Sequence, residues 1–151
     1  MVPHLLDDLD RSILRHLNED ARKSFRDIAR ELGVSISTVS NRVKRLEQEG
    51  IIQGYAPLLD EKRLGYEVLA VIGMQISKGK LLEVQRRIAK DERAVDVFDV
   101  TGEWDSVIVA RFRNTRELDA FVKRLVTMEN VERTYTQVVL NVVKREKRVS
   151  V

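Results

Sequence analysis

The sequence predicts an α+β fold, in which a three-helix N-terminal domain of the (winged) helix-turn-helix type precedes a C-terminal ferredoxin-like βαββαβ domain. Two observations predict this class. Apolar residues recur at helical spacing through residues 9–48, and after them apolar strand-like runs alternate with two helical segments. A polar stretch that ends in glycine, residues 60–65, separates the two patterns. We therefore expect domains at residues 1–52 and 66–151, joined by a strand or hinge linker at residues 53–65.

The composition is that of a folded protein without cysteine chemistry. Of the 151 residues, 43% are hydrophobic, which is enough to bury a core. The absence of cysteine excludes disulfides, thiol catalysis and cysteine-ligated zinc. No apolar run has the length of a membrane span, and the N-terminus lacks the basic start and apolar stretch of a signal peptide. We expect a cytoplasmic protein.

Three N-terminal helices are expected from their apolar spacing and from the residues at their ends. They are placed at residues 9–17, 24–32 and 35–48. Asp7 or Asp8 can cap the first helix. Ser24 and Ser35 can cap the other two, and Gly33 lies where a helix usually ends in a left-handed residue. A helix pair joined by a short glycine-containing turn is typical of the helix-turn-helix, whose second helix enters the DNA major groove.

The third helix has an apolar stripe and a polar face opposite to it. Val39, Val43 and Leu46 recur at i, i+4 and i+7, which predicts that they face the core. The other face carries hydroxyl, amide and cationic side chains and no acid: Ser37, Thr38, Asn41, Lys44, Arg45 and Gln48. Such groups meet phosphates and base edges in a major groove, so this face predicts a contact with double-stranded DNA.

Positive charge is concentrated around the same motif. Residues 22–45 hold seven cations and two acids, a net charge of +5 in a chain whose total is +3. We expect Ser37, Thr38 and Asn41 to read bases. The phosphate contacts are expected from a wider set: Ser24, Arg26, Ser35, Arg42, Lys44 and Arg45. The alternative is an ordinary helical hairpin with a solvated outer face.

The segment after the third helix permits two interpretations. Residues 51–58 are largely apolar with turn residues among them, and Pro57 restricts any strand there to an edge or an end. The segment is either one strand of a reduced wing or an arm between the two domains.

The second half of the chain alternates strands and helices. Strands are expected at residues 69–76, 95–101, 106–112 and 131–143, with helices at residues 80–90 and after a cap at Thr115. This order is the ferredoxin-like arrangement, in which both helices cover one face of a four-stranded antiparallel sheet. Because the strands are apolar on both sides, both faces must be buried. The simplest cover is a second copy of the sheet, which predicts a homodimer or a larger assembly. The charged run at residues 144–148 is expected to be a solvated end.

Two segments carry a resemblance to a known family. The run DRSILRHLNEDARKSFRDIARELGVSISTVSNRVKRLEQEGIIQGY at residues 10–55, followed by a hinge and by VTGEWDSVIVARF at residues 100–112, resembles the leucine-responsive/asparagine regulators, the Lrp/AsnC or feast/famine family. The resemblance extends over residues 9–143. It implies a winged helix-turn-helix DNA-binding domain and a ligand-sensing dimerisation domain. It also implies dimers that assemble further, often into octamers, with an amino acid or related metabolite bound between dimers.

The resemblance also implies an effector site. The Gly-x-x-Asp loop of the family corresponds here to Gly102, Glu103, Trp104 and Asp105, and its second lining segment corresponds to Thr134, Tyr135 and Thr136. A carboxylate in such a loop can pair with a ligand ammonium group, and backbone amides can hold its carboxylate. The family usually has tyrosine or phenylalanine where Trp104 stands, and Glu103 adds a second acid, which favours a ligand with a positive or polar side chain. The alternative is a plain hairpin turn with Trp104 as an assembly contact.

The expected function is that of a regulator without catalysis. The residues favour a sequence-specific DNA-binding regulator that binds a near-palindromic operator as a dimer. The resemblance to the family implies that it responds to an amino acid or related metabolite. An architectural DNA-packaging protein with little or no ligand control is the alternative. The sequence contains no G-x-G-x-x-G, Walker or H-E-x-x-H motif, so we expect no catalytic residues, no metal ligands and no cofactor other than the small-molecule effector.

Overall fold

The computed structural model describes residues 6–151, which form two compact units. The first contains the residues up to Leu58 together with Lys144–Val151, and the second contains Leu59–Val143. The tail therefore groups with the N-terminal unit, whereas the sequence placed it in the C-terminal domain. Within the described residues, no helix combines the length and the apolarity that a membrane crossing requires.

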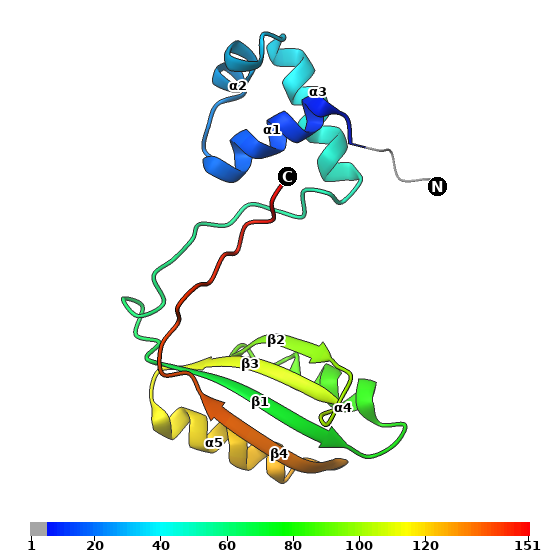
Figure 1. Cartoon of the computed structure of the whole chain (residues 1–151), viewed down its shortest axis with the longest axis vertical. Helices are drawn as coiled ribbons and strands as arrows, with labels where there is room; N and C mark the ends of the chain where they lie inside the picture. The colour runs from blue at the N-terminus through cyan, green and yellow to red at the C-terminus, as the bar shows by residue number, and fades with distance from the viewer. Residues whose placement is uncertain (1–5) are drawn as a thin grey trace. The chain divides into compact units, whose positions relative to one another are not determined.

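The N-terminal unit is built from three helices (Figure 1). They are α1 (Asp8–Glu19), α2 (Phe25–Leu32) and α3 (Ile36–Gln48), close to the predicted ranges. The apolar stripes of the three helices meet in one core, which contains Ile13, Leu17, Ile28, Ala29, Val39 and Val43. Asp7 begins α1 as its N-cap, in a capping box with Asp10.

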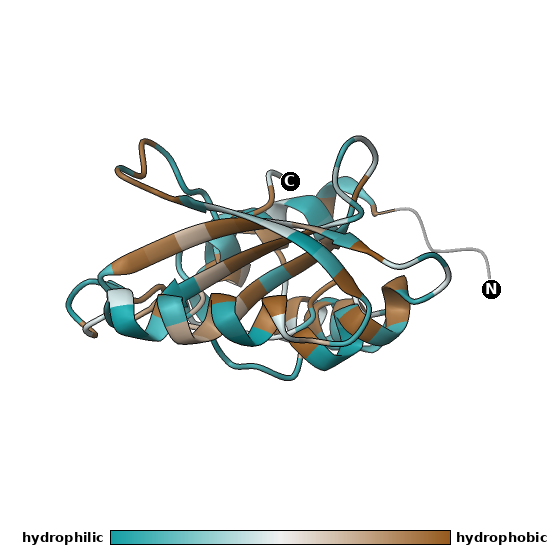
Figure 2. Ribbon diagram, turned by 90° about the horizontal axis from the view of Figure 1, so that it is seen from below, coloured by the Kyte–Doolittle hydropathy of each residue, from teal (hydrophilic) through white to brown (hydrophobic). Residues whose placement is uncertain are grey.

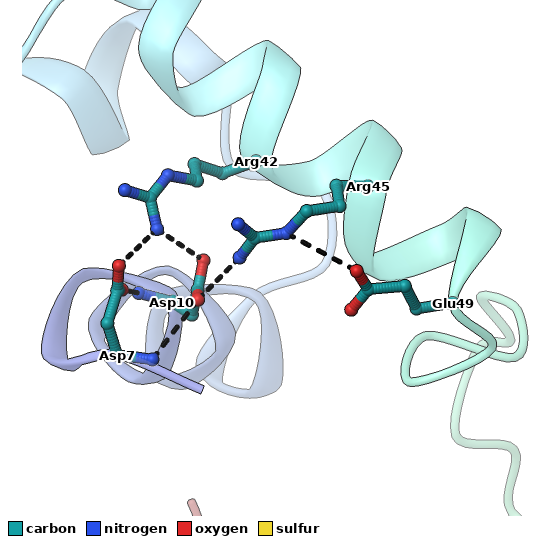
Figure 3. A network of polar contacts seen from close by, with 5 residues as sticks. All are labelled: Asp7, Asp10, Arg42, Arg45 and Glu49. Carbon is teal, nitrogen blue, oxygen red and sulfur yellow. Dashed lines mark hydrogen bonds and ion pairs between the residues drawn. The ribbon is translucent and has the colours of Figure 1, made fainter. Parts of the chain in front are cut away.

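A buried carboxylate fixes α1 against α3 (Figure 3). The Asp10 side chain is fully shielded from solvent. Its Oδ1 accepts a hydrogen bond from Arg42 Nη1 at 3.0 Å, and its Oδ2 accepts one from Arg45 Nη2 at 2.5 Å. Arg42 also pairs with Asp7, and the Arg45 Nε lies 3.9 Å from a Glu49 oxygen. The charge of Asp10 is therefore paired and hydrogen-bonded, which a buried ion requires.

The end of the tail is hydrogen-bonded to α1, while the charged run at residues 144–148 is exposed to solvent, as the sequence predicted. Asn18 Nδ2 donates to the carbonyl oxygen of Val149 at 2.8 Å, and Arg15 Nε donates to the Val151 oxygen at 2.8 Å. Within the tail, Arg148 pairs with Glu146 at 3.0 Å. These contacts belong to the N-terminal unit, which explains why the tail clusters with it.

The segment after α3 contains no strand, so the interpretation of residues 51–58 as a wing strand is wrong. Gly50 adopts a left-handed φ of 73°, and the amides of Ile51 and Ile52 both donate to the carbonyl oxygen of Leu46. Ile52 packs against the helical core, and the Tyr55 hydroxyl donates to Glu47 at 2.9 Å. The first residues of the segment thus close the end of α3 and do not pair with another strand.

The second unit has the predicted ferredoxin-like order. Its elements are β1 (Val68–Ile76), α4 (Leu81–Ile88), β2 (Ala94–Asp99), β3 (Ser106–Phe112), α5 (Thr115–Val126) and β4 (Val131–Val138). The strands pair antiparallel in the order β2-β3-β1-β4. Figure 2 shows both helices of this unit on the same side of the sheet. The predicted α+β fold class is confirmed.

The two faces of the sheet differ in what covers them. The helix-covered face carries the core of the unit, including Ile72, Met74 and Ile108, which are fully buried. The opposite face also carries apolar residues, since Val71 pairs with Val109 and both remain half-buried, while Phe98 is 48% exposed. Both faces of the sheet are therefore apolar, as predicted. The face that the helices do not cover, called the open face below, has no cover within the single chain.

The end of the last strand and the cap of the last helix differ from the sequence prediction. The last strand ends at Val138, not at residue 143, because its partner β1 begins at Val68 and the last bond between them joins the Val139 amide to the Leu69 carbonyl oxygen. The cap of α5 is Asn114 and not Thr115, since the Asn114 side chain accepts from the Glu117 amide at 3.0 Å.

Replacement of the buried carboxylate tests what fixes α1 to α3. Asp10→Asn removes the charge that holds Arg45, and breaking such a buried pair typically costs about 3–5 kcal/mol. We expect urea unfolding, followed by circular dichroism at 222 nm, to show a loss of about that size for the N-terminal unit. Asp8→Asn, in the exposed first turn of the same helix, is the control and should change stability by less than about 0.5 kcal/mol. Equal effects of the two substitutions would contradict the role of Asp10.

Asp7 contributes to the stability of the folded protein in a way that depends on pH. The hydrogen bond from Arg42 lowers the pKa of Asp7 from 3.8 to about 2. A carboxyl whose pKa is lowered by folding stabilises the protein above its unfolded pKa, and this stabilisation is lost as the pH falls from 3.8 to about 2. Asp7→Asn keeps a good helix cap but loses the charge. We expect the stability difference between wild type and this variant to vanish across that window in acid titrations; a difference that persists at the lower end would contradict the assignment.

Candidate functional site

The turn between α2 and α3 has helix-turn-helix chemistry. Ser24 caps α2 by accepting from the Asp27 amide at 3.1 Å, and Gly33 ends that helix with a left-handed φ of 67°. The Val34 amide closes the helix by donating to the Ala29 carbonyl oxygen. Ser35 then caps α3 by accepting from the Thr38 amide at 3.1 Å. The predicted caps and the predicted turn are therefore present.

The polar face of α3 is open to solvent. Val39, Val43 and Leu46 are buried, as the stripe predicted. Ser37, Asn41 and Lys44 follow one another along the opposite side and are exposed, whereas Thr38 is half-buried beside the cap. This arrangement presents hydroxyl, amide and ammonium groups outward, while the apolar stripe fixes the helix to the core.

The beginning of α3 is suited to an anion. Its first turn contains no acid, so the positive end of the helix dipole is not compensated there. The Ser35 hydroxyl lies 2.9 Å from that of Ser37 and 2.7 Å from that of Thr38. Ser24 differs from Ser35, because its hydroxyl donates to the Asp27 carboxylate at 2.5 Å and lowers the pKa of that carboxyl. Arg26, the second residue of α2, is exposed.

The structure places Arg42 and Arg45 differently from the other predicted DNA contacts. Both guanidinium groups point toward α1 and bind Asp10, and Arg42 binds Asp7 as well (Figure 3). Because both guanidinium groups are already paired with carboxylates, they are not available to bind a DNA phosphate. This pairing could not be predicted from local sequence patterns, because the two acids precede the arginines by more than thirty residues and belong to the beginning of another helix.

The predicted effector loop connects β2 to β3 and is tied to the end of β1. Gly102 adopts a φ of 116°, which favours glycine. The Asp105 amide donates to the Met74 carbonyl oxygen at 2.9 Å, and its Oδ2 accepts from the Ile76 amide at 2.8 Å. The other carboxylate oxygen of Asp105 makes no hydrogen bond to any residue between 6 and 151. Glu103 accepts a bond from Gln75 through its backbone oxygen, at 3.0 Å.

Trp104 lies on the open face of the sheet, directly over Gly73. A Cβ atom at Gly73 would come within 2.8 Å of the Trp104 ring, so only glycine allows this approach. The ring stacks on Tyr135 with centroids 5.7 Å apart, and the Arg133 guanidinium lies 5.3 Å from its centroid. Gly73 and Arg133 were not predicted as site residues. A glycine inside an apolar strand was the available signal for the first of them, because it marks a close approach.

The second predicted lining segment is divided by the alternation of β4. Tyr135 pairs with Gly73 and lies on the open face with Trp104. Thr134 pairs with Met74 and Thr136 with Ile72, and both of those partners are fully buried on the helix-covered face. Adjacent strand residues point to opposite faces, so the two threonines do not join the Trp104 cluster within one chain.

Comparison with known proteins gives matches over both units. A family model described as winged helix-turn-helix DNA-binding matches residues 6–53, and one described as the Lrp/AsnC ligand binding domain matches residues 69–149. An HTH-type transcriptional regulator of Pyrococcus abyssi is 43% identical over 144 residues, which cover 95% of this chain and 98% of the relative. The HTH-type transcriptional regulator Ptr1 of Methanocaldococcus jannaschii is 40% identical over 141 residues, or 93% and 95% of the two chains.

Solved structures agree over nearly the whole length. Escherichia coli AsnC matches with a TM-score of 0.90 and 26% identity, covering 96% of this chain and 99% of that one. A transcriptional regulator of Neisseria meningitidis, solved in complex with L-Met, matches with a TM-score of 0.87 and 27% identity, covering 95% and 96%. With its helix-turn-helix DNA-binding domain and its Lrp/AsnC ligand-binding domain, the chain belongs to the Lrp/AsnC family of transcriptional regulators.

Proposed function

We propose that the protein regulates transcription by binding a near-palindromic double-stranded operator through α3, and that an amino acid or related metabolite controls its assembly or its DNA binding. The observation that carries this proposal is the exposed row Ser37, Asn41 and Lys44, opposite a buried stripe. As a regulator of chromosomal genes it acts in the cytoplasm, without catalysis and without a cofactor besides its effector.

The proposed contacts divide into base-reading and phosphate-holding groups. Ser37, Thr38 and Asn41 read base edges, since hydroxyl and amide groups form the directional bonds that distinguish bases. The phosphate set is narrower than the sequence predicted and comprises Ser24, Arg26, Ser35 and Lys44. Arg42 and Arg45 are left out because Asp7 and Asp10 already bind them. The free amides at the beginning of α3 support a phosphate contact beside Ser35.

Assembly is proposed to occur first through the open sheet face. Its half-buried apolar residues, such as Val71 and Val109, lack a cover in the single chain. A second copy of the same face would bury them and give a twofold-related dimer. Two recognition helices would then meet two half-sites, which is why the proposed operator is near-palindromic. Further association of dimers, to an octamer, follows the resemblance to the family.

The proposed effector site lies at the Gly102–Asp105 loop, with Trp104 and Tyr135 as its aromatic wall. An amino acid carries one ammonium and one carboxylate group. The unpartnered oxygen of Asp105 suits the ammonium, and Arg133, which is 60% exposed, suits the carboxylate. The L-Met complex of the Neisseria relative supports an amino acid as the ligand class. Glu103 lies 3.7 Å from Arg133, so its charge is shared with that residue.

Two alanine substitutions on α3 separate base reading from phosphate binding. Asn41→Ala should cost about 1–3 kcal/mol on the operator and little on unrelated DNA, because a lost base contact reduces discrimination. Lys44→Ala should weaken both DNAs alike and reduce the salt slope by about 1. Fluorescence anisotropy at several salt concentrations measures both effects.

The control is Lys78→Ala, an exposed lysine of the second unit. Unchanged DNA binding in both α3 variants would contradict the assigned face. A footprint also separates the two candidate functions: one defined palindromic site supports regulation, whereas uniform coverage supports an architectural role.

Trp104 is the only tryptophan and reports on the proposed effector site. Each of the twenty amino acids is titrated while its emission is recorded, and we expect at least one to change the emission and raise the melting temperature. Gly73→Ala should displace the ring and abolish the response, because its Cβ would come 2.8 Å from the indole. Thr134→Val, on the other face of the same sheet, is the control and should respond as wild type does. A response that survives in Gly73→Ala but not in Thr134→Val would contradict the site.

A further inference from the structure

A cationic cavity lies in the second unit, apart from both sites described above. It has a volume of about 830 Å3 and opens where β1 and β2 begin and β3 ends. Six of its lining residues are cations: Arg87, Lys90, Arg93, Arg111, Arg113 and Arg124. Three are carboxylates, and Glu61, which is not part of the lining, pairs with Arg111 at 2.7 Å. The lining therefore keeps an excess of positive charge even after this pair is counted. None of these residues belongs to the proposed DNA-contacting or effector sets.

The carboxylates of the cavity are largely committed to internal contacts. Asp91, whose side chain is 7% exposed, accepts bonds from Arg93 at 2.9 and 2.7 Å and also binds Arg124, and these arginines hold its pKa well below the usual range. Glu117 accepts from the backbone amide of Arg113 at 2.9 Å. The third, Glu92, is exposed at the rim. One buried carboxylate thus faces two guanidinium groups.

Aromatic rings hold four of the arginines in place. The guanidinium groups of Arg93 and Arg124 lie 5.2 and 5.3 Å from the centroid of Phe121. Those of Arg111 and Arg113 lie 5.8 and 5.0 Å from the centroid of Tyr66. Side chains that are already ordered lose little conformational freedom when they bind a ligand. The hydrogen-bond donors of these four arginines are therefore preorganised for a ligand, unlike those of freely moving surface side chains.

Two further cations have no counter-charge. Arg87, in the last turn of α4, and Lys90, just after that helix, form neither a hydrogen bond nor an ion pair with another residue of the described chain, 6–151. Both are exposed at the cavity. Cations that converge from α4, β2, β3 and α5 repel one another unless an anion joins them.

We propose that this cavity binds a small metabolite that carries two or three linked phosphate groups. A guanidinium group donates two parallel hydrogen bonds to a phosphate, which is why arginine is preferred where phosphate is recognised. A volume of about 830 Å3 lies within the range of roughly 300–1,000 Å3 that small-molecule sites occupy. Linked phosphates also match the several positive charges better than a single carboxylate does. The assignment is independent of the proposed amino acid effector.

Isothermal titration calorimetry with inorganic tripolyphosphate, at constant ionic strength, tests the proposal on the full chain. The wild type should bind, and the double variant Arg87→Gln/Lys90→Gln should bind at least about tenfold more weakly, because two charge-assisted contacts are lost. The matched control is Arg86→Gln/Lys78→Gln, which removes the same charge from exposed residues outside the cavity. Its affinity should stay within about twofold of wild type. Absence of binding by the wild type, or equal losses in both double variants, overturns the proposal.

Duplex DNA is the other source of phosphate, and a second arm distinguishes it. Binding of an unrelated duplex is measured for the same three proteins by fluorescence anisotropy. We expect Arg87→Gln/Lys90→Gln to bind the duplex as its charge-matched control does, and tripolyphosphate not to compete with the duplex. If the cavity variant instead loses duplex binding in parallel with tripolyphosphate binding, the cavity serves the DNA backbone and the small-metabolite proposal is overturned.

Discussion

The orientation of the recognition helix depends on a carboxylate that water cannot reach. Asp10 is charged and buried, so its desolvation must be offset by partners with good geometry, and Arg42 and Arg45 of α3 supply them. An apolar stripe alone would allow a helix to slide or rotate slightly on its core. The two guanidinium groups remove that freedom, because each must meet a fixed oxygen. The surface of α3 is thereby divided into three parts: an apolar stripe in the core, the two arginines that bind Asp10, and an exposed polar row. Only the polar row is free to contact another molecule.

A second constraint of the same kind shapes the sheet. Successive strand residues point to opposite faces, so the open face is defined once the helix-covered face is filled. Gly73 interrupts this face with a missing side chain, and Trp104 fills the gap from the β2–β3 loop. The loop is also held by Asp105, whose carboxylate accepts from the Ile76 amide. The β2–β3 turn is therefore docked on the sheet, and its aromatic side chain becomes part of the surface that a ligand or a second copy would meet.

Most of the fold could be predicted from local sequence patterns, but contacts between segments that are distant in the sequence could not. The three N-terminal helices, the strand at residues 106–112 and the βαββαβ order were predicted from spacing, caps and turns, and the family matches confirm the resemblance as well as the fold class. The partners of Arg42 and Arg45 could not be predicted, because they lie on another helix. The end of β4 depends on where β1 begins, and the separation of Tyr135 from its two threonine neighbours depends on which register β4 adopts.

The distribution of charge shows why the net charge of a sequence window overstates the positive charge that is available to bind DNA. Residues 22–45 have a net charge of +5, but Asp7 and Asp10, which lie outside that window, bind two of its arginines and bring the local sum to +3. Lys23 pairs with Glu31 and Arg30 with Asp27. Among the described residues of this segment, Arg22, Arg26 and Lys44 remain without an ion pair. Under the proposed function, few counterions would be released per unit, so hydroxyl, amide and helix-end groups must supply a larger share of the affinity than the net charge suggests.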